Sequence, residues 1–264
     1  NEMFHLPDLP KRALVVGGGY IASEFACILK GLGVDVSQYY RGAQILRGFD
    51  DEARALVAAR MQASGISISC NTDVARLEKT ATGILATTES GASEEFDLVM
   101  YATGRKPNSA GLGLEALGVP LGRNGEIRVD GWSQTAVPSI FAIGDVTGRV
   151  NLTPVAIREG MAFVETVFKA NPSAFDQEMV ATAVFSQPEI GTVGLSEEDA
   201  GDRFDEVEIY RATFRPMRNV LGNRQERMLV KLVVGRAGRV CTMRSLRQKP
   251  GLQTEHQAVQ RACH

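Results

Sequence analysis

Short-range cysteine motifs are absent from this sequence. Its four cysteines, Cys27, Cys70, Cys241 and Cys263, are too far apart to form a Cys-x-x-Cys redox motif or the ligand spacing of a zinc site. We therefore expect no bound metal. Cys27 lies in an apolar stretch of helical character, where a buried, reduced thiol is expected. Scattered cysteines of this kind are typical of a reducing compartment, so we expect a cytoplasmic protein.

Long apolar runs and an excess of charge of one sign are absent as well. No apolar run approaches the roughly 20 residues needed to cross a bilayer. The first ten residues have no basic start followed by an apolar core, so they do not resemble a secretion signal. A formal net charge of −2 over 264 residues gives no electrostatic reason to expect a nucleic acid or a membrane as partner.

The first part of the chain predicts a parallel α/β unit. Ala13 to Val16 is a short apolar run that ends at a glycine, as expected of a strand buried on both faces. Apolar residues recur at helical spacing from Tyr20 to Lys30, and Val34 to Tyr40 can form a second strand. Strand, glycine turn, helix and strand make a βαβ unit, which implies a parallel sheet.

A second helix and an antiparallel meander are expected next. Acidic residues from Asp50 onward favour a helix start, and the helix is expected to run toward Met61. Residues 71–100 alternate strand-like pieces with polar turns. This pattern predicts a meander inserted before a last strand at Leu98 to Ala102.

The remainder of the chain changes character at two points. A strand is expected at Pro138 to Ile143, followed by a helix that begins near Pro154, and beyond Val180 the pattern favours alternating strands. Pro107 and Asn108 mark one boundary, and Pro172 opens a linker before the shift at Val180. Together with the family resemblance given below, these changes imply a linker at 1–10 and segments at 11–106, 107–175, 176–234 and 235–264. The last segment lacks strand or helix periodicity, so we expect it to be irregular.

A glycine motif lies between the first strand and the first helix. Gly17, Gly19 and Ala22 form Gly-x-Gly-x-x-Ala. The first glycine permits a tight turn, the second lets a pyrophosphate approach, and the small third residue lets helix and strand pack closely. Glycines also mark plain turns, but the position between a strand and a helix favours a dinucleotide site.

The end of the second strand indicates which dinucleotide is bound. NAD sites usually have a carboxylate about 20 residues after the glycines, where it binds the ribose hydroxyl. That window contains Tyr39, Tyr40 and Arg41, without an acid, and Arg47 follows. Two guanidinium groups suit a 2′-phosphate, so we predict NADPH. The alternative is two solvated surface arginines.

A second candidate segment, Ser139 to Asp145, has the sequence SIFAIGD and is followed by Leu-Thr-Pro at 152–154. A buried strand that ends at Gly144 and Asp145 would place a carboxylate at a sheet edge, where it could accept hydrogen bonds from ligand hydroxyls. The alternative is that Asp145 only caps a helix or a turn.

Several segments in a fixed order resemble the pyridine nucleotide-disulfide oxidoreductases. They are VVGGGYIASEFA, YYRGAQILRGFD, YATGRKPN, SIFAIGDVTGRVNLTPVA and FSQPEIGTVGL, and the later FRPMRNVLGNRQERMLVKLVV is similar to the glutathione reductases of that family. The resemblance covers Asn1 to about Val234. It implies an α/β fold with a Rossmann-like NADPH-binding domain at 11–106, in which a parallel sheet carries an antiparallel meander. Part of an FAD-binding domain at 107–175 and a truncated α+β dimerisation domain at 176–234 would follow.

The resemblance also implies roles for single residues. Tyr20 would cover the flavin until the nicotinamide displaces it, and Glu24 would help to seat the carboxamide. Asp145 would bind the flavin ribityl chain, and Thr153 would lie close to the flavin ring. The alternatives are a Tyr20 packed on the sheet and a solvated Glu24. The full set of implied cofactor-binding residues is Gly17, Gly19, Tyr20, Ile21, Ala22, Glu24, Arg41, Arg47, Gly104, Gly144, Asp145, Leu152 and Thr153.

The redox centre of the family is not found in the sequence. The resemblance implies a hydride path from NADPH to FAD, then to a Cys-x-x-x-x-C pair in an N-terminal segment, then to glutathione disulfide. No such pair occurs, and none of His5, His256 and His264 precedes a proline, as the family's C-terminal acid-base histidine does. The chain begins at Asn1, without a start methionine. We expect a fragment without catalytic residues, inactive alone and compromised in FAD binding.

Two classes of function remain open. The parent protein is expected to be a homodimeric, NADPH-dependent glutathione-disulfide reductase of cellular redox homeostasis. The alternative is an NADP-binding module without redox activity. Within the enzyme class, dihydrolipoyl dehydrogenase and mercuric reductase are rivals, and the first normally uses NAD, with an acid where Tyr40 stands. Met161 stands where some glutathione reductases have an arginine for the glutathione carboxylate, which leaves the disulfide substrate open.

Overall fold

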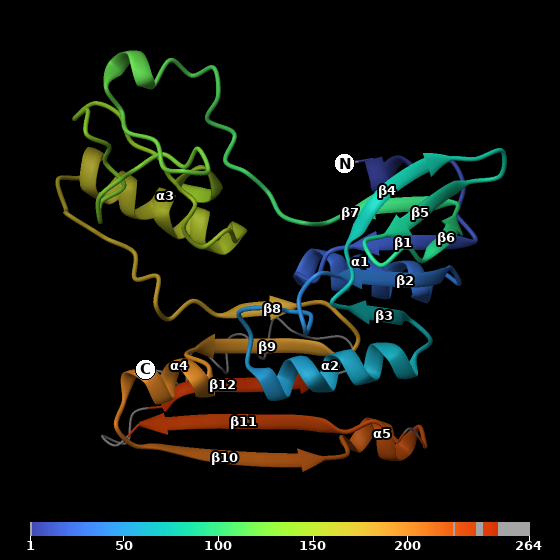
Figure 1. Cartoon of the computed structure of the whole chain (residues 1–264). Helices are drawn as coiled ribbons and strands as arrows, with labels where there is room; N and C mark the ends of the chain where they lie inside the picture. The colour runs from blue at the N-terminus through green and yellow to red at the C-terminus, as the bar shows by residue number, and fades with distance from the viewer. Residues whose placement is uncertain (1, 224, 236–239, 248–264) are drawn as a thin grey trace. The chain divides into compact units, whose positions relative to one another are not determined.

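The computed structural model describes the backbone of residues 2–223, 225–235 and 240–247 (Figure 1). Two compact units make up the chain. The larger unit combines Asn1–Gly104 with Ala181–His264, and the smaller unit is Arg105–Val180. Most of each segment expected at 11–106 and 176–234 therefore lies in one compact unit, while 105–106 and 176–180 belong to the smaller one. None of the helices in the described part of the chain is long and apolar enough to span a bilayer.

A four-stranded parallel sheet forms the first part of the larger unit. Its strands, in spatial order, are β3 (Ser67–Cys70), β2 (Asp35–Tyr40), β1 (Arg12–Val16) and β7 (Leu98–Tyr101). Helix α1 (Tyr20–Gly31) connects β1 to β2, and α2 (Asp51–Ala63) connects β2 to β3. The predicted βαβ unit is confirmed, and so is the helix that begins after Asp50, whose side chain accepts a hydrogen bond from the Ala53 amide.

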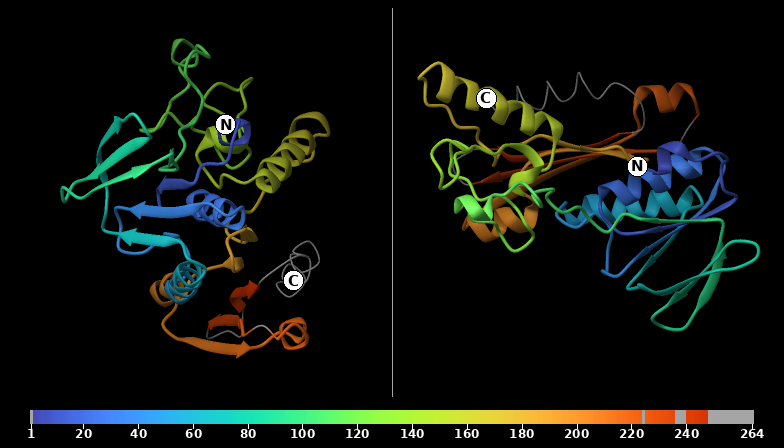
Figure 2. Two further views of the ribbon diagram at one scale, coloured as in Figure 1. Left: turned by 90° about the vertical axis from the view of Figure 1, so that its right-hand side faces the viewer. Right: turned by 90° about the horizontal axis from the view of Figure 1, so that it is seen from above.

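Both faces of β1 are buried, as its apolar run predicts. Ala13 and Val15 belong to the core that contains the buried residues of α1 and α2. Leu14 and Val16 pack instead with Phe96 of the meander. The helices and the meander thus cover opposite faces of the parallel sheet, as the view from above shows (Figure 2). The meander is a three-stranded antiparallel sheet of β4 (Val74–Lys79), β5 (Ile84–Thr88) and β6 (Ser93–Phe96).

A five-stranded antiparallel sheet completes the larger unit (Figure 1). Its strands, in spatial order, are β10 (Val207–Phe214), β11 (Met228–Gly235), β12 (Val240–Arg247), β9 (Glu189–Gly194) and β8 (Thr182–Val184). Helix α4 (Glu197–Arg203) begins with a capping box formed by Ser196 and Asp199, and α5 (Met217–Leu221) precedes β11. The expected alternation of strands beyond Val180 is confirmed.

The expectation of an irregular segment from 235 onward is wrong for 240–247. These residues form β12, which pairs with β11 on one side and with β9 on the other. The backbone groups at both edges need hydrogen-bond partners, and a strand inserted between them supplies these whatever its side-chain pattern. The rest of the expected tail, 248–264, lies outside the described residues.

The smaller unit contains one long helix and several turns. Helix α3 (Thr153–Phe168) begins with a proline in its first turn, as predicted. The expected strand at Pro138 to Ile143 is wrong, because the only described pairing there is an isolated bridge between Gln134 and Phe141. A single bridge cannot build a ladder. Ala142 nevertheless belongs to the core of this unit. The short 3-10 turns of the chain are η1 (Glu2–His5), η2 (Glu115–Leu117) and η3 (Gly144–Thr147).

Candidate dinucleotide-binding site

The first glycine of the motif occupies a position that no larger residue could fill. Gly17 has φ +140°, and a Cβ on it would lie 2.4 Å from the carbonyl oxygen of Ala102, the residue that follows β7. The Gly17 amide donates to the Tyr39 carbonyl at 2.8 Å, and the Ala102 amide donates to the Val16 carbonyl at 2.8 Å. The chain therefore turns tightly at the carboxyl edge of the sheet while it stays hydrogen-bonded to both neighbouring strands.

The second glycine is open. No atom lies within 4 Å of a Cβ built on Gly19. Gly19 is the N-cap of α1, and no side chain of the described residues caps this helix end, whose first turn carries no acid. Ala22 is fully buried against the turn. Uncapped amides at a helix N-terminus attract anions, so the residues present fit a pyrophosphate.

A buried glutamine on the neighbouring strand supports the turn. Gln38 of β2 is fully buried, and its Nε2 donates to the Gly17 carbonyl at 3.0 Å and lies 3.4 Å from Ser23 Oγ. Its Oε1 has no hydrogen-bond partner among the described residues. This role of Gln38 was not predicted from the sequence. Its strand also contains Asp35 and Ser37, so a polar residue at position 38 does not stand out.

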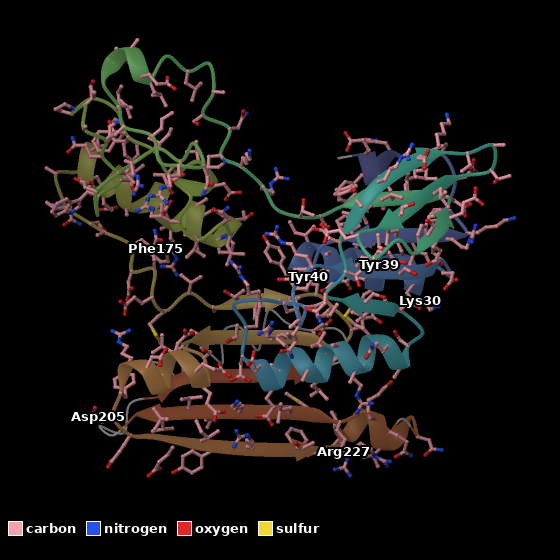
Figure 3. The ribbon with its side chains drawn as sticks, in the orientation of Figure 1. Lys30, Tyr39, Tyr40, Phe175, Asp205 and Arg227 are labelled. Atoms are coloured by element: carbon pink, nitrogen blue, oxygen red, sulfur yellow. The ribbon has the colours of Figure 1, made fainter. Side chains whose placement is uncertain are left out.

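The two tyrosines that replace the NAD-type carboxylate occupy opposite faces of β2 (Figure 3). Tyr39 lies on the meander face, where it packs edge-on against Phe96. The ring of Tyr40 lies on the other face and covers Gly18, at which a Cβ would meet ring atoms at 2.4–2.6 Å. Gly18, between the two motif glycines, is therefore also required, and the run of three glycines was the sequence signal for it.

Residues 41–49, here named the arginine loop, lie against the glycine turn. The Leu46 amide donates to the Gly18 carbonyl at 2.5 Å, and the Asn71 amide donates to the Gly42 carbonyl at 3.0 Å. Ile45 and Leu46 are fully buried. Arg41 and Arg47, carried by this loop, are exposed, and neither forms a hydrogen bond or an ion pair with the described residues. The fold thus brings both arginines to the edge of the sheet where the glycine turn lies.

Arg54 of α2 organises this loop and was not predicted from the sequence. Its Nε donates to the Ile45 carbonyl at 2.8 Å and its second terminal nitrogen donates to the Gln44 carbonyl at 2.7 Å. Arg54 also pairs with Asp51, and the Gln44 side chain donates to the Asp51 carbonyl at 3.1 Å. The loop is therefore held by several bonds rather than by its ends alone.

The far side of α1 contacts the segment before β9. Glu24 is half-buried and accepts a hydrogen bond from the Phe185 amide at 2.8 Å. Burial raises the pKa of Glu24, although the Phe185 bond opposes this. Glu24 is therefore not the fully solvated carboxylate of the alternative interpretation. Cys27 is a buried free thiol, as predicted, and its Sγ accepts from the Gln187 amide at 3.3 Å. Tyr20, at the start of α1, is 36% exposed.

The remaining candidates of the larger unit are placed more simply. Ile21 is half-buried in the first turn of α1. Gly104 follows β7 at the carboxyl edge of the sheet and has φ +137°, and a Cβ added to it would meet no atom within 4 Å. A nucleotide could therefore approach its backbone without a clash.

A buried carboxylate, Glu159, binds one of the candidates of the smaller unit, Gly144. Gly144 has φ +70°, and its amide donates to Glu159 of α3 at 2.6 Å. Arg149 pairs with the same carboxylate at 2.9 Å. Asp145 lies on the 3-10 turn η3 and not at the end of a strand, which is the place expected from the sequence. Its side chain is exposed and makes no hydrogen bond with the described residues, so it does not cap a helix or a turn.

Leu152 and Thr153 lie at the start of α3. Leu152 is the N-cap residue and offers no side-chain cap, and Thr153 is exposed in the first turn. Glu159, which holds the turn of Gly144 in place, was not predicted from the sequence because helical spacing does not reveal which carboxylate becomes buried. The smaller unit thus presents Asp145 and Thr153 to solvent on a rigid support.

The geometry defines a class of protein. A parallel sheet with a glycine turn at its carboxyl edge, followed by a helix with a free N-terminus, is the arrangement of dinucleotide-binding α/β domains. Here this domain is joined in one compact unit to a five-stranded antiparallel sheet.

Known protein families then identify the chain. Residues 1–160 match the family described as pyridine nucleotide-disulphide oxidoreductase, and residues 180–243 match the dimerisation domain of that family. The first match covers more than half of the 264 residues, and the chain belongs to this family. The resemblance found in the sequence is confirmed. The second match extends past Val234, so the expected end of the resemblance there is wrong.

Characterised relatives of high identity are glutathione and trypanothione reductases. Glutathione reductase of Burkholderia cepacia is 50% identical over 234 residues, which cover 89% of this chain and 52% of that protein. The chloroplastic/mitochondrial glutathione reductase of Pisum sativum is 46% identical over 87% of this chain and 42% of that protein. Trypanothione reductase of Trypanosoma congolense is 44% identical over 88% and 48%. The chain spans about half the length of the curated relatives it matches.

Solved structures of similar fold include LpdA and the flavoprotein disulfide reductase RclA. LpdA of Mycobacterium tuberculosis has a TM-score of 0.83 and 27% identity, over 93% of this chain and 54% of that chain. The HOCl-induced flavoprotein disulfide reductase RclA of Escherichia coli has a TM-score of 0.88 over 99% of this chain and 59% of that chain. Its 24% identity supports the shared fold alone.

Proposed function

We propose that this chain is the NADPH-binding and dimerisation part of a flavoprotein disulfide reductase that reduces glutathione disulfide. The observation that carries the proposal is the arginine loop, which presents Arg41 and Arg47 beside the glycine turn where an NAD site would have a carboxylate. Relatives named glutathione reductase, at 44–50% identity, support glutathione disulfide as the substrate. A second candidate substrate is trypanothione disulfide, because other relatives are named trypanothione reductase. Met161 stands where some glutathione reductases have an arginine for the glutathione carboxylate, so that contact does not favour glutathione here.

Each candidate residue has a role in this proposal. The backbone at Gly17 and Gly19, with the first amides of α1, binds the pyrophosphate of NADPH. Arg41 and Arg47 bind the 2′-phosphate through charge-assisted hydrogen bonds. Tyr20, at the start of the same helix, lies at the nicotinamide end. NADPH supplies a hydride and FAD accepts it, which is the chemistry these groups provide when bound.

The other residues orient the two cofactors. Glu24 receives the nicotinamide carboxamide, and Gly104 lets the nucleotide approach the chain after β7. Asp145 accepts hydrogen bonds from the flavin ribityl chain, and Thr153, with Leu152 and Gly144 beside the same turns, lies near the flavin ring. The match to the family's dimerisation domain supports a homodimer. A cytoplasmic role in redox homeostasis is the remaining part of the proposal. A redox-inactive NADP-binding module is the second candidate, favoured by the missing Cys-x-x-x-x-C pair.

Calorimetric titration with NADPH and NADH tests the proposal. The ligands differ only at the 2′ position, where two arginine contacts are worth about 2–3 kcal/mol after solvent screening, or roughly 30- to 150-fold in affinity. Arg41→Ala/Arg47→Ala should remove this preference and leave NADH binding nearly unchanged, and added salt should narrow the gap.

A charge-matched control separates this effect from a general change of net charge. Arg76→Ala/Arg203→Ala removes two exposed arginines from β4 and α4. This variant should keep the preference for NADPH. Equal affinities of the unchanged chain for both nucleotides would refute the proposal.

A further inference from the structure

One lysine of the five-stranded antiparallel sheet contacts the starts of α2 and α4 through a cluster of charges. Lys231, on β11, is 2% exposed. Its Nζ lies 2.9 Å from Asp50 Oδ2, 3.1 Å from Glu52 Oε2 and 2.5 Å from Glu197 Oε2. Arg211, on β10, pairs with Glu52 at 2.7 Å and with Glu197 at 2.9 Å. We name these five residues the charge cluster.

Lys231 stands at a position where an apolar residue is expected. The side chains of β11 alternate between buried and half-buried, and Leu229 and Val233 flank Lys231 on the buried face. Burial alone lowers the pKa of Lys231, but hydrogen bonds to Glu197, Asp50 and Glu52 outweigh it and raise the pKa. The lysine is therefore charged at neutral pH. Apolar residues of similar volume often replace such buried ion pairs without loss of stability, so stability alone does not explain this lysine.

Asp50 links the charge cluster to the arginine loop. It is the residue directly after the loop and the N-cap of α2, and its Oδ1 accepts from the Ala53 amide at 3.2 Å. Its Oδ2 accepts from Lys231 and, at 3.4 Å, from the Glu197 amide. The arginine loop thus begins where β2 ends, at Tyr40. At its other end, Asp50 is bound to the antiparallel sheet through Lys231 of β11.

We propose that Lys231 is a positioning residue for recognition of the NADPH 2′-phosphate, acting through Asp50 on the end of the arginine loop. The inference rests on the proposed function, because it assigns Arg41 and Arg47 to the phosphate. A loop fixed before the ligand arrives loses less conformational freedom on binding, and affinity rises accordingly. The antiparallel sheet thereby takes part in nucleotide selectivity, although Lys231 itself does not contact the nucleotide.

Two variants separate positioning from folding. Lys231→Met leaves Asp50 buried without its cation, so Tm should fall. The double variant Asp50→Asn/Lys231→Met removes both charges and keeps the N-cap, because asparagine caps as well as aspartate. Its Tm should recover most of the loss. The affinity for NADPH should nevertheless stay about tenfold weaker in both variants, or ~1.4 kcal/mol, while NADH affinity changes less than about twofold.

Arg211→Met is the matched control within the charge cluster. It removes a cation whose ion pairs in the described residues are with Glu52 and Glu197, and which acts on Asp50 only at longer range. This variant should keep the NADPH preference of the unchanged chain. Calorimetric titration and thermal unfolding of the full 264-residue chain measure both quantities.

Three results overturn the inference. A double variant that regains the NADPH preference together with its Tm would show that Lys231 only stabilises the fold. An Arg211→Met variant that loses as much selectivity as Lys231→Met would show that the link through Asp50 is not the route. In both cases the proposed function would still stand if the unchanged chain prefers NADPH over NADH and Arg41→Ala/Arg47→Ala abolishes that preference. Equal NADPH and NADH affinities of the unchanged chain would overturn both.

Discussion

The backbone amide of Phe185 donates to the carboxylate of Glu24 at 2.8 Å, across 161 residues of sequence. Three residues further along α1, Cys27 accepts from the amide of Gln187 at 3.3 Å. The helix that begins at the glycine turn is therefore held on its far side by the segment between β8 and β9. Glu24, which we assign to the nicotinamide end of the site, thus also accepts a structural hydrogen bond. Substitutions of Glu24 can separate the effect of its charge from the effect of this bond.

Glu24→Gln should stabilise the protein at neutral pH. Burial raises the pKa of Glu24 above its ordinary value of 4.5. The folded state therefore favours the protonated acid, and the contribution of Glu24 to stability is present below pH 4.5 and is lost as the pH rises through the raised pKa. Glutamine keeps the acceptor for Phe185 without the charge. We expect Tm to rise by about 1–2 °C at pH 7 and to be unchanged at pH 4.

Glu24→Ala is the contrasting variant. It leaves the Phe185 amide without its acceptor, which should cost about 1–3 kcal/mol at either pH. Thermal unfolding of both variants between pH 4 and pH 8 measures these differences. A Glu24→Gln variant less stable than the unchanged chain at pH 7 would mean that the ionised carboxylate is favoured after all.

Alanine at the two motif glycines should separate folding from binding. Gly17→Ala combines a left-handed φ with a contact of 2.4 Å to the Ala102 carbonyl, so we expect a loss of about 3 kcal/mol or more. Gly19→Ala has open space and an extended backbone, so it should cost about 1 kcal/mol or less. In the proposed function its Cβ would intrude on the space of the pyrophosphate, so NADPH should bind about tenfold or more weakly. Chemical unfolding and calorimetry test the pair, and unchanged NADPH binding by Gly19→Ala would count against the pyrophosphate site.

Glu159→Ala should destabilise the smaller unit. It removes the partner of Arg149 and leaves the buried Gly144 amide without an acceptor, which should cost about 3–5 kcal/mol. Glu165→Ala, on the same helix, removes two surface contacts, an ion pair with Lys169 and a hydrogen bond from the Asn171 side chain at 3.3 Å, and should cost less than about 1 kcal/mol. The single tryptophan, Trp132, lies beside Glu159 in this unit, so its fluorescence during urea unfolding reports the difference. Equal midpoints for the two variants would contradict the role of Glu159.

The 264-residue chain alone should not oxidise NADPH in the presence of glutathione disulfide. No two of its cysteines have the Cys-x-x-x-x-C spacing, so no thiol pair can take electrons from the flavin. FAD should also be held weakly, because the roles proposed for Asp145 and Thr153 involve only the ribityl chain and the ring of the flavin. An absorbance spectrum after gel filtration and a coupled activity assay test both statements, with an intact glutathione reductase as positive control. A stoichiometric flavin peak or steady turnover would refute them.

The sequence alone determined the local elements and their order. The apolar run 13–16 and the helical spacing of 20–30 each depend on neighbours in the chain, and the strand, the helix and the glycine turn between them are confirmed, while the dinucleotide site at that turn stays a prediction. The meander at 71–100 was also predicted from a local pattern, strand-like pieces that alternate with polar turns. The family could be recognised because short motifs in a fixed order are specific. Arg41 and Arg47 could be selected from the sequence because the strand before them ends at a predictable place.

Only the tertiary structure decided which polar groups are buried and which strands are paired. Residues 240–247 became a strand because β9 and β11 offered unsatisfied backbone groups on both sides. Residues 138–143 instead meet the short segment 133–135 on one side, through an isolated bridge and two flanking hydrogen bonds. Lys231 and Gln38 are polar strand residues whose side chains are buried. Each is stabilised by a partner distant in the chain: Asp50, 181 residues from Lys231, and Gly17, 21 residues from Gln38. The free energy of a buried charge depends on those partners, and no local pattern contains them.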